Sequence, residues 1–146
     1  MKLATAFPII GVGCVIAGGL TAAVTAHTPS EHATWAAAYL VLVAGVAQVA
    51  LGAGQARLAD QQPSSVWLIG ELATWNLGNA LVIAGTVAGL TPLVDIGGLL
   101  LVVALALFAS VGRRQTHRLL VLYRAVIAVV LVSIPVGLVI ANVRGQ

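Results

Sequence analysis

Two charged residues lie within long apolar stretches of the sequence, and they are the side chains best able to do chemistry there. Glu71 and Arg124 each follow the polar residue that opens their stretch by six positions. In a helix, both would lie about 9 Å from the same boundary of the apolar layer. A charge at such depth is unfavourable by about 2.5 to 3.5 kcal/mol on insertion scales and usually has a partner. We predict an ion pair between Glu71 and Arg124, with Tyr123 or Gln55 as a neighbour.

A second interpretation leaves the two residues apart. Arg124 would extend its side chain to lipid phosphates, and Glu71 would be neutral. Glu71 is also the candidate acid or base if the protein is an intramembrane enzyme. The sequence has no Ser/His/Asp set that can be placed together, no HExxH, no P-loop and no GxGxxG, so we predict that it is not an enzyme.

Amide side chains accompany the glutamate. Gln48 and Gln55 share one helical stripe with Gly45 and Gly52, because residues four and seven apart nearly eclipse one another. In the next apolar stretch, one predicted face carries a mixed polar and small set: Glu71, Trp75, Gly78, Asn79, Thr86 and Gly89. Gln48, Asn76 and Asn79 are predicted to hold helices together at about 0.6 to 2 kcal/mol per contact. The alternative is a polar pathway for a solute or protons.

A further group of candidate ligands lies in the loops. His27, Glu31 and His32 fall in one loop, and Asp95 lies near the start of a later stretch. Two histidines and two carboxylates can form a metal site, although this spacing matches no specific motif, and the two histidines are also candidates for binding haem. We predict no cofactor and solvated loop residues. The lone Cys14 is predicted to be a small packing residue.

The elements that position these residues are apolar throughout. Apolar residues make up 60% of the 146 and charged residues only 8%, against about 25% charged in a typical soluble domain. The composition therefore predicts an integral membrane protein in contact with the lipid bilayer. The net charge of +3 comes from scattered basic residues that make no stripe, so a nucleic-acid partner is not expected.

Five windows are long enough to span a bilayer, for which about 20 apolar residues are needed. They cover roughly residues 3–25, 34–56, 66–90, 92–112 and 119–142. We therefore predict an all-α membrane protein, a single domain over residues 1–146 that forms a bundle of five transmembrane helices with short loops.

Basic residues predict the orientation of this bundle in the cell membrane. An inward N-terminus places most of the loop charges in the cytoplasm, and only Arg144 outside; the inner set is Lys2, Arg57, Arg113, Arg114 and Arg118. The C-terminus is then extracytoplasmic. Residues 1–26 also resemble a secretory signal, but the apolar run is longer than a typical signal core, so we expect it to be retained. Trp35 and Trp67 are predicted interfacial anchors.

Small residues and an internal similarity suggest how the helices associate. Gly45, Gly52, Gly85 and Gly89 are predicted packing positions, the last two as a GxxxG pattern. Residues 31–45 and 71–85 align at an offset of forty, from chance or from a duplication that would give inverted symmetry.

These features predict a small, non-enzymatic accessory or structural subunit that docks onto another membrane protein or onto copies of itself. The alternative is a small oligomeric transporter or channel with a polar pathway around Glu71. A haem- or metal-binding protein that uses His27 and His32 is the third hypothesis.

Overall fold

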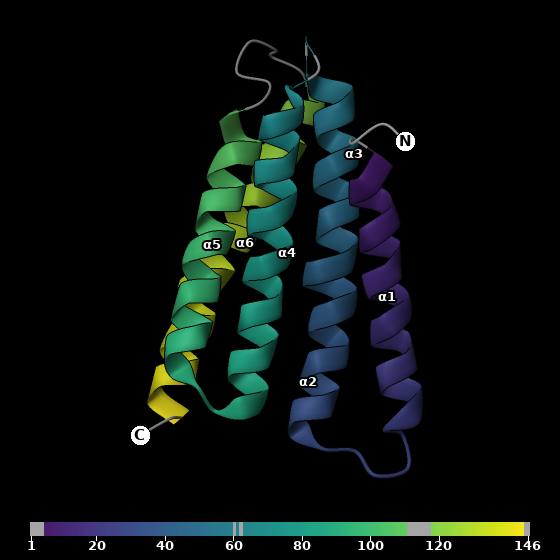
Figure 1. Ribbon diagram of the computed structural model, residues 1–146, viewed down its shortest axis with the longest axis vertical. Coiled ribbons are helices and arrows are strands. Elements are labelled where there is room, and N and C mark those ends of the chain that lie inside the picture. The colour runs from purple at the N-terminus through teal and green to yellow at the C-terminus, as the bar shows by residue number, and fades with distance from the viewer. Residues whose placement is uncertain (1–4, 60, 62, 111–117, 145–146) are drawn as a thin grey trace. The chain divides into compact units, whose positions relative to one another are not determined.

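The described part of the chain consists of helices joined by short loops, without strands. The computed structural model describes residues 5–59, 61, 63–110 and 118–144, with the backbone alone at 119 and 133–144. The chain forms two compact units, residues 1–53 and 54–146. The boundary between them falls inside a helix (Figure 1).

The first unit is a pair of packed helices. Helix α1 (Ala6–Val24) packs against α2 (Glu31–Tyr39) and its continuation η2 (Leu40–Ala47), after which α3 (Gln48–Leu58) crosses into the second unit. Ser30 caps α2, since its hydroxyl accepts a hydrogen bond from the Ala33 N–H at 3.1 Å. Segment η2 is π-helical, whereas the sequence predicted an uninterrupted α-helix there.

Glycines bring α1 and its partner into close contact. A Cβ on Gly18 would lie 2.8 Å from the Ala37 carbonyl oxygen, and one on Gly45 would lie 2.9 Å from that of Gly11. Gly52 leaves room for the ring of Phe7 in the same way. Gly18, Gly45 and Gly52 are therefore used in the packing of this unit itself.

The second unit begins with the end of α3 and contains a tight helical hairpin. Helix α4 (Ser65–Ala88) starts at Ser64, whose hydroxyl accepts from the Trp67 N–H at 3.3 Å. It ends at Gly89, which adopts a left-handed conformation with φ of 67°. The Leu90 N–H then donates to the Gly85 carbonyl at 2.8 Å, and α5 (Thr91–Ser110) follows at once. Gly89 thus closes the helix, and a Cβ at this predicted packing position would meet no atom within 4 Å in the described part of the chain.

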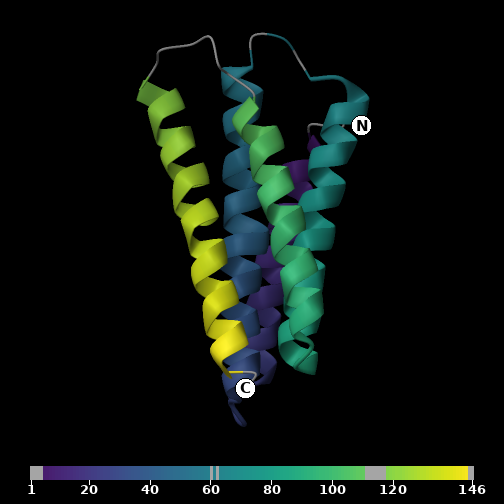
Figure 2. The ribbon, with the colours of Figure 1, turned by 90° about the vertical axis from the view of Figure 1, so that its left-hand side faces the viewer.

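Helices α4 and α5 lie side by side along their lengths (Figures 1 and 2). A Cβ on Gly97 would lie 2.7 Å from the Gly78 carbonyl oxygen, and one on Gly85 would lie 2.8 Å from the Val94 nitrogen. These backbones meet so closely that only hydrogen fits at the two contacts. Gly85 therefore packs a helix as predicted, against α5.

Helix α6 (Arg118–Arg144) joins this unit through Tyr123. The Tyr123 hydroxyl donates to the Phe108 carbonyl on α5 at 3.4 Å. Its ring fills the space beside Gly54 of α3, where a Cβ would lie 2.5 Å from a ring carbon.

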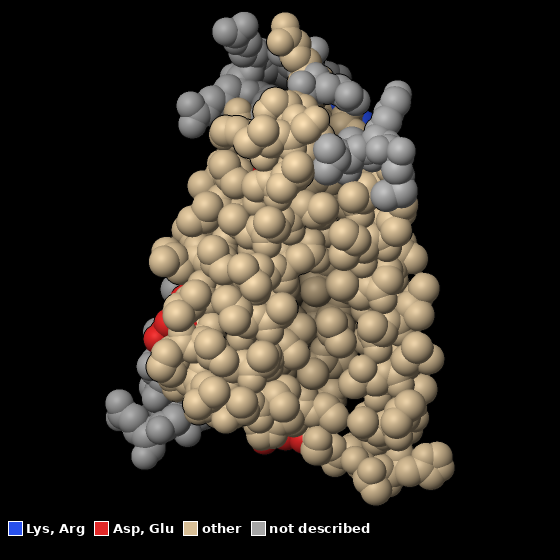
Figure 3. Space-filling view, viewed as in Figure 1, with Lys and Arg blue, Asp and Glu red and all other residues tan. Residues whose placement is uncertain are grey.

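Four helices in the described part of the chain are long and apolar enough to cross a membrane: Ala6–Val24, Glu31–Leu58, Ser65–Ala88 and Thr91–Ser110. Within α6 the apolar helix described is Leu120–Val132. Large apolar side chains such as Ile16, Leu77 and Leu99 are more than half exposed, at 57%, 55% and 64%. Few charged side chains interrupt the face of the molecule in Figure 3. The predicted loop arginines Arg113 and Arg114 lie outside the described residues.

Candidate functional site

A fully buried carboxylate is the most unusual side chain of the second unit. Glu71 lies on the second turn of α4 and has no exposed surface. The predicted inward face of α4 is confirmed at Glu71, Trp75, Gly78 and Asn79, all buried, while Leu77 on the opposite face is exposed. Glu71 and Trp75 are four residues apart, and Trp75 and Gly78 are three apart, so all three lie on one face of the helix.

Two neutral side chains satisfy the carboxylate. Gln55 Nε2 donates to both Glu71 oxygens, at 2.7 Å to Oε1 and 2.8 Å to Oε2. Trp67 Nε1 donates to Oε1 at 3.0 Å. Gln55 is itself 3% exposed, so this contact is shielded from bulk solvent. The sequence prediction of Gln55 as a neighbour of Glu71 is confirmed by these distances.

The predicted ion pair with Arg124 is not formed in the described part of the chain. Arg124 is exposed on α6, and the oxygens of Glu71 are instead directed at Gln55 and Trp67. Equal depth along two helices was the basis of the prediction, but pairing also requires that both residues face each other. Tyr123, the neighbour of Arg124, takes the inward position of α6.

Trp67 has a role that the sequence analysis missed. It was interpreted as an interfacial anchor, and its 39% exposed ring is compatible with that position. Its indole N–H nevertheless reaches the carboxylate four residues later. Trp67 and Glu71 stand at the spacing at which helical side chains meet, which was the available signal.

The asparagines of α4 bond to their own helix. Asn76 Nδ2 donates to the Leu72 carbonyl and Asn79 Nδ2 to the Trp75 carbonyl, both at 2.8 Å. The described contacts thus differ from the predicted amide bonds between helices, because the carbonyl four residues earlier is nearer than a neighbouring helix. Asn76 is half-buried, whereas Asn79 is 3% exposed.

Some buried polar atoms have no hydrogen-bond partner among the described residues. They are Trp75 Nε1 and Asn79 Oδ1 in the second unit, and Nε2 and Oε1 of the fully buried Gln48 in the first. An unsatisfied buried polar group costs about 1 to 3 kcal/mol, so a water or polar ligand that bonded to these atoms would remove that cost.

The arrangement around Glu71 suits a group that gains and loses a proton. The Gln55 amide donates to the ionised carboxylate through Nε2. After a half-turn of the amide, its carbonyl oxygen can accept from the O–H of the neutral acid. One neighbour therefore satisfies both protonation states, and no basic side chain among the described residues neutralises the negative charge.

The predicted metal ligands belong to two units of the chain, His27, Glu31 and His32 to the first and Asp95 to the second. His27, Glu31 and His32 are exposed at the start of the second helix and in the loop before it, and Asp95 is exposed on α5. Within the described residues, no group of three or more His, Cys, Asp or Glu side chains could hold a metal ion. His32 lies on the first turn of α2, and His27 lies in the loop before it.

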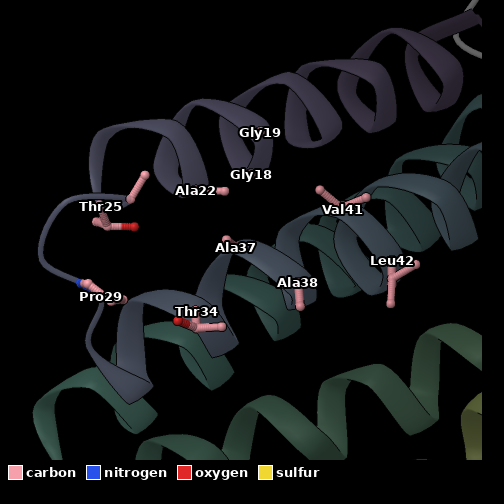
Figure 4. A pocket seen from close by; sticks show the side chains of 11 residues that line it. Gly18, Gly19, Ala22, Thr25, Pro29, Thr34, Ala37, Ala38, Val41 and Leu42 are labelled. Atoms are coloured by element: carbon pink, nitrogen blue, oxygen red, sulfur yellow. The ribbon is translucent and has the colours of Figure 1, made fainter.

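An open groove of about 470 Å³ lies in the first unit between α1 and the α2–η2 helix (Figure 4). Most residues that line the groove are small or apolar, and its hydroxyl groups come from Thr25 and Thr34. The lining residues are Gly18, Gly19, Ala22, Thr25, Ala26, Pro29, Thr34, Ala37, Ala38, Val41 and Leu42. The Thr25 hydroxyl is occupied by the Thr21 carbonyl at 2.7 Å. The groove therefore has few polar groups that could bind a ligand, and Glu71 remains the best candidate site.

Comparisons with models of known protein families, with curated proteins and with solved structures found no match to this chain.

Proposed function

We propose that the protein is a small integral membrane transporter in which Glu71 binds the coupling proton or cation. The observation that carries this proposal is the carboxylate itself, which is fully buried and, among the described residues, hydrogen-bonded by the neutral side chains of Gln55 and Trp67. Ionisable residues inside membrane helices are costly, and they usually mark ion pathways or proton relays.

Membrane insertion is part of this proposal. Its support is the length and apolar character of the four helices, together with their exposed Ile, Leu and Val side chains. We propose that the described part of α6 and its continuation form a fifth span. The N-terminus is then cytoplasmic and the C-terminus extracytoplasmic, as the basic residues indicate.

A transporter is favoured over an accessory subunit because of how the glycines are used. The subunit hypothesis depended on more small-residue surface than one bundle needs. Gly11, Gly18 and Gly45 pack within the first unit, and Gly78 and Gly97 within the second. The close contacts they supply are therefore internal, and the need for a docking partner is weaker.

The proposed cycle uses the chain's own groups. Glu71 takes up a proton and becomes neutral, so that the carboxyl group no longer carries an uncompensated charge in apolar surroundings. The Gln55 amide reorients to accept its O–H. Release of the proton restores the carboxylate and the two bonds from Gln55 Nε2. Alternate exposure of this site to the two sides would couple proton movement to a solute.

A pH jump applied to proteoliposomes on a solid-supported membrane tests the proposal, with the proton as the probe. We expect a transient current from the wild type and its loss in Glu71→Gln. A sodium jump at constant pH gives the same test for a cation. The matched control is Glu31→Gln, since Glu31 is exposed on α2 and stands forty residues before Glu71 in the internal similarity. Currents equal to those of protein-free liposomes in both jumps would refute the proposal.

The accessory subunit remains the second candidate function, and open positions on α1 favour it. Cβ atoms at Gly13 and Gly19 would meet no atom within 4 Å, so another helix has room to approach there. Native mass spectrometry of protein extracted from its own membrane in mild detergent tests this function. Stoichiometric association with another polypeptide would support it, and a homo-oligomer alone would favour transport.

A further inference from the structure

Two asparagines on α4 make the same backbone bond but differ in what surrounds them. Asn76 and Asn79 each donate Nδ2 to the carbonyl four residues earlier at 2.8 Å. Asn76 is half-buried, and its oxygen is not among the buried atoms that lack a partner in the described part of the chain. Asn79 is 3% exposed, and its Oδ1 has no partner among the described residues.

A matching donor lies one turn away. Trp75 has no exposed surface, and its Nε1–H is likewise without a partner in the described part of the chain. The indole is held by an edge-to-face contact with Phe108, with ring centroids 6.1 Å apart and planes at 85°. A fixed donor and a fixed acceptor are thus buried on the same face of α4, four residues apart.

A water molecule can satisfy both of these groups at once. A water molecule accepts from an indole N–H and donates to an amide oxygen, and its remaining O–H and lone pair stay free for a further partner. Buried waters typically make about three hydrogen bonds to polar groups that would otherwise be unsatisfied. A metal ion is excluded as the occupant because the N–H of Trp75 cannot ligate one.

We propose that Trp75 and Asn79 hold a buried water molecule one turn along α4 from Glu71, and that protons reach Glu71 through it. The first part is independent of transport, and the second rests on the proposed function. In the transfer, the bound water gives the proton of its remaining O–H to a carboxylate oxygen of Glu71 as its free lone pair accepts a proton from an incoming hydronium, so that neutral water stays bound. Release runs in the opposite direction, with the carboxylic acid proton returned to the water.

Nuclear magnetic resonance tests the water directly, because the chain has only three tryptophans. Protein labelled with ¹⁵N at the indole nitrogens and reconstituted in nanodiscs gives three N–H signals, and Trp75→Phe identifies one by its loss. We expect a cross-peak between bound water and the Trp75 indole. It should disappear in Asn79→Leu and persist in the matched control Asn76→Leu. Absence of the cross-peak in the wild type, or its persistence in Asn79→Leu, would overturn the proposal.

The pH-jump current tests the proton path. Asn79→Leu and Trp75→Phe should each slow the current at least roughly tenfold relative to Asn76→Leu, the factor produced by a barrier higher by about 1.4 kcal/mol. Trp75→Phe keeps the ring against Phe108, so it retains the packing if Asn79→Leu fails to fold. Wild-type rates in a folded variant would overturn the path. If the folded Asn79→Leu or Trp75→Phe variant kept the wild-type rate while Glu71→Gln lost the current, the proton path would be refuted and the proposed function would stand.

Discussion

The side-chain amide of Gln55 donates to both carboxylate oxygens of Glu71, at 2.7 and 2.8 Å. This pair joins the end of α3 to α4, sixteen residues apart in the sequence. It replaces the salt bridge by which a buried carboxylate is often satisfied. A neutral partner leaves the charge of Glu71 variable, whereas an arginine would hold it ionised.

Removal of the Gln55 amide should destabilise the protein. In Gln55→Leu, one carboxylate oxygen loses its only described donor, and we expect unfolding to become easier by about 1 to 3 kcal/mol. Denaturant titration in detergent measures the change. Gln61→Leu, at an exposed loop position, is the control and should change little. Equal stability of Gln55→Leu and wild type would show that the amide bond does not hold α3 to α4.

The indole of Trp67 should contribute less than the amide. Trp67→Phe removes one donor at 3.0 Å from a residue that is 39% exposed, so we expect a loss of about 1 kcal/mol. The control is Trp35→Phe, because the Trp35 ring contacts that of Tyr39 with centroids 5.0 Å apart and planes at 31°, and a phenylalanine ring keeps this contact. A larger loss in Trp35→Phe than in Trp67→Phe would argue that ring packing, not the bond to Glu71, dominates.

Arg124 and Glu71 should behave as independent residues. We expect the effects of Glu71→Gln and Arg124→Gln on unfolding free energy to add within about 0.5 kcal/mol, as they do for residues that share no partner. The double-mutant cycle in detergent measures this sum. A coupling energy well above that value would restore the ion pair predicted from depth and contradict the observed hydrogen bonds.

The contact between α4 and α5 should tolerate no added carbon. Gly97→Ala places a Cβ 2.7 Å from the Gly78 carbonyl oxygen and 2.8 Å from the Val82 nitrogen, both backbone atoms. We expect a loss of about 1 to 3 kcal/mol, measured by thermal unfolding in detergent. At Gly13 of α1 a Cβ meets nothing within 4 Å, so Gly13→Ala should be neutral or stabilising. The reverse order would contradict the described packing.

The helices could be predicted from the sequence to within a few residues because apolar length alone marks them. The windows 34–56 and 66–90 correspond to helices at Glu31–Leu58 and Ser65–Ala88. Local bonding was harder to predict. The π-helical turn at Leu40–Ala47 and the left-handed Gly89 depend on contacts and backbone angles that hydropathy does not encode.

The residues of the candidate site could be predicted from the sequence better than the hydrogen bonds between them. Periodicity placed Glu71 and Asn79 on the inward face of α4, and Gln55 was named as a neighbour. The choice of Gln55 over Arg124 depends on how α3 and α6 are rotated about their axes. Tyr123 occupies the inward position of α6, so the adjacent Arg124 turns outward. A single sequence does not specify that rotation.

Infrared difference spectroscopy of the protein in lipid tests most directly whether Glu71 exchanges protons. Acidification should produce a carboxylic acid C=O band in wild type that is lost in Glu71→Gln and retained in Glu31→Gln. The band should reverse when the pH is raised again. Spectra of Glu71→Gln that match those of wild type would show that Glu71 keeps one protonation state, and the proposal that it binds the coupling proton would fail.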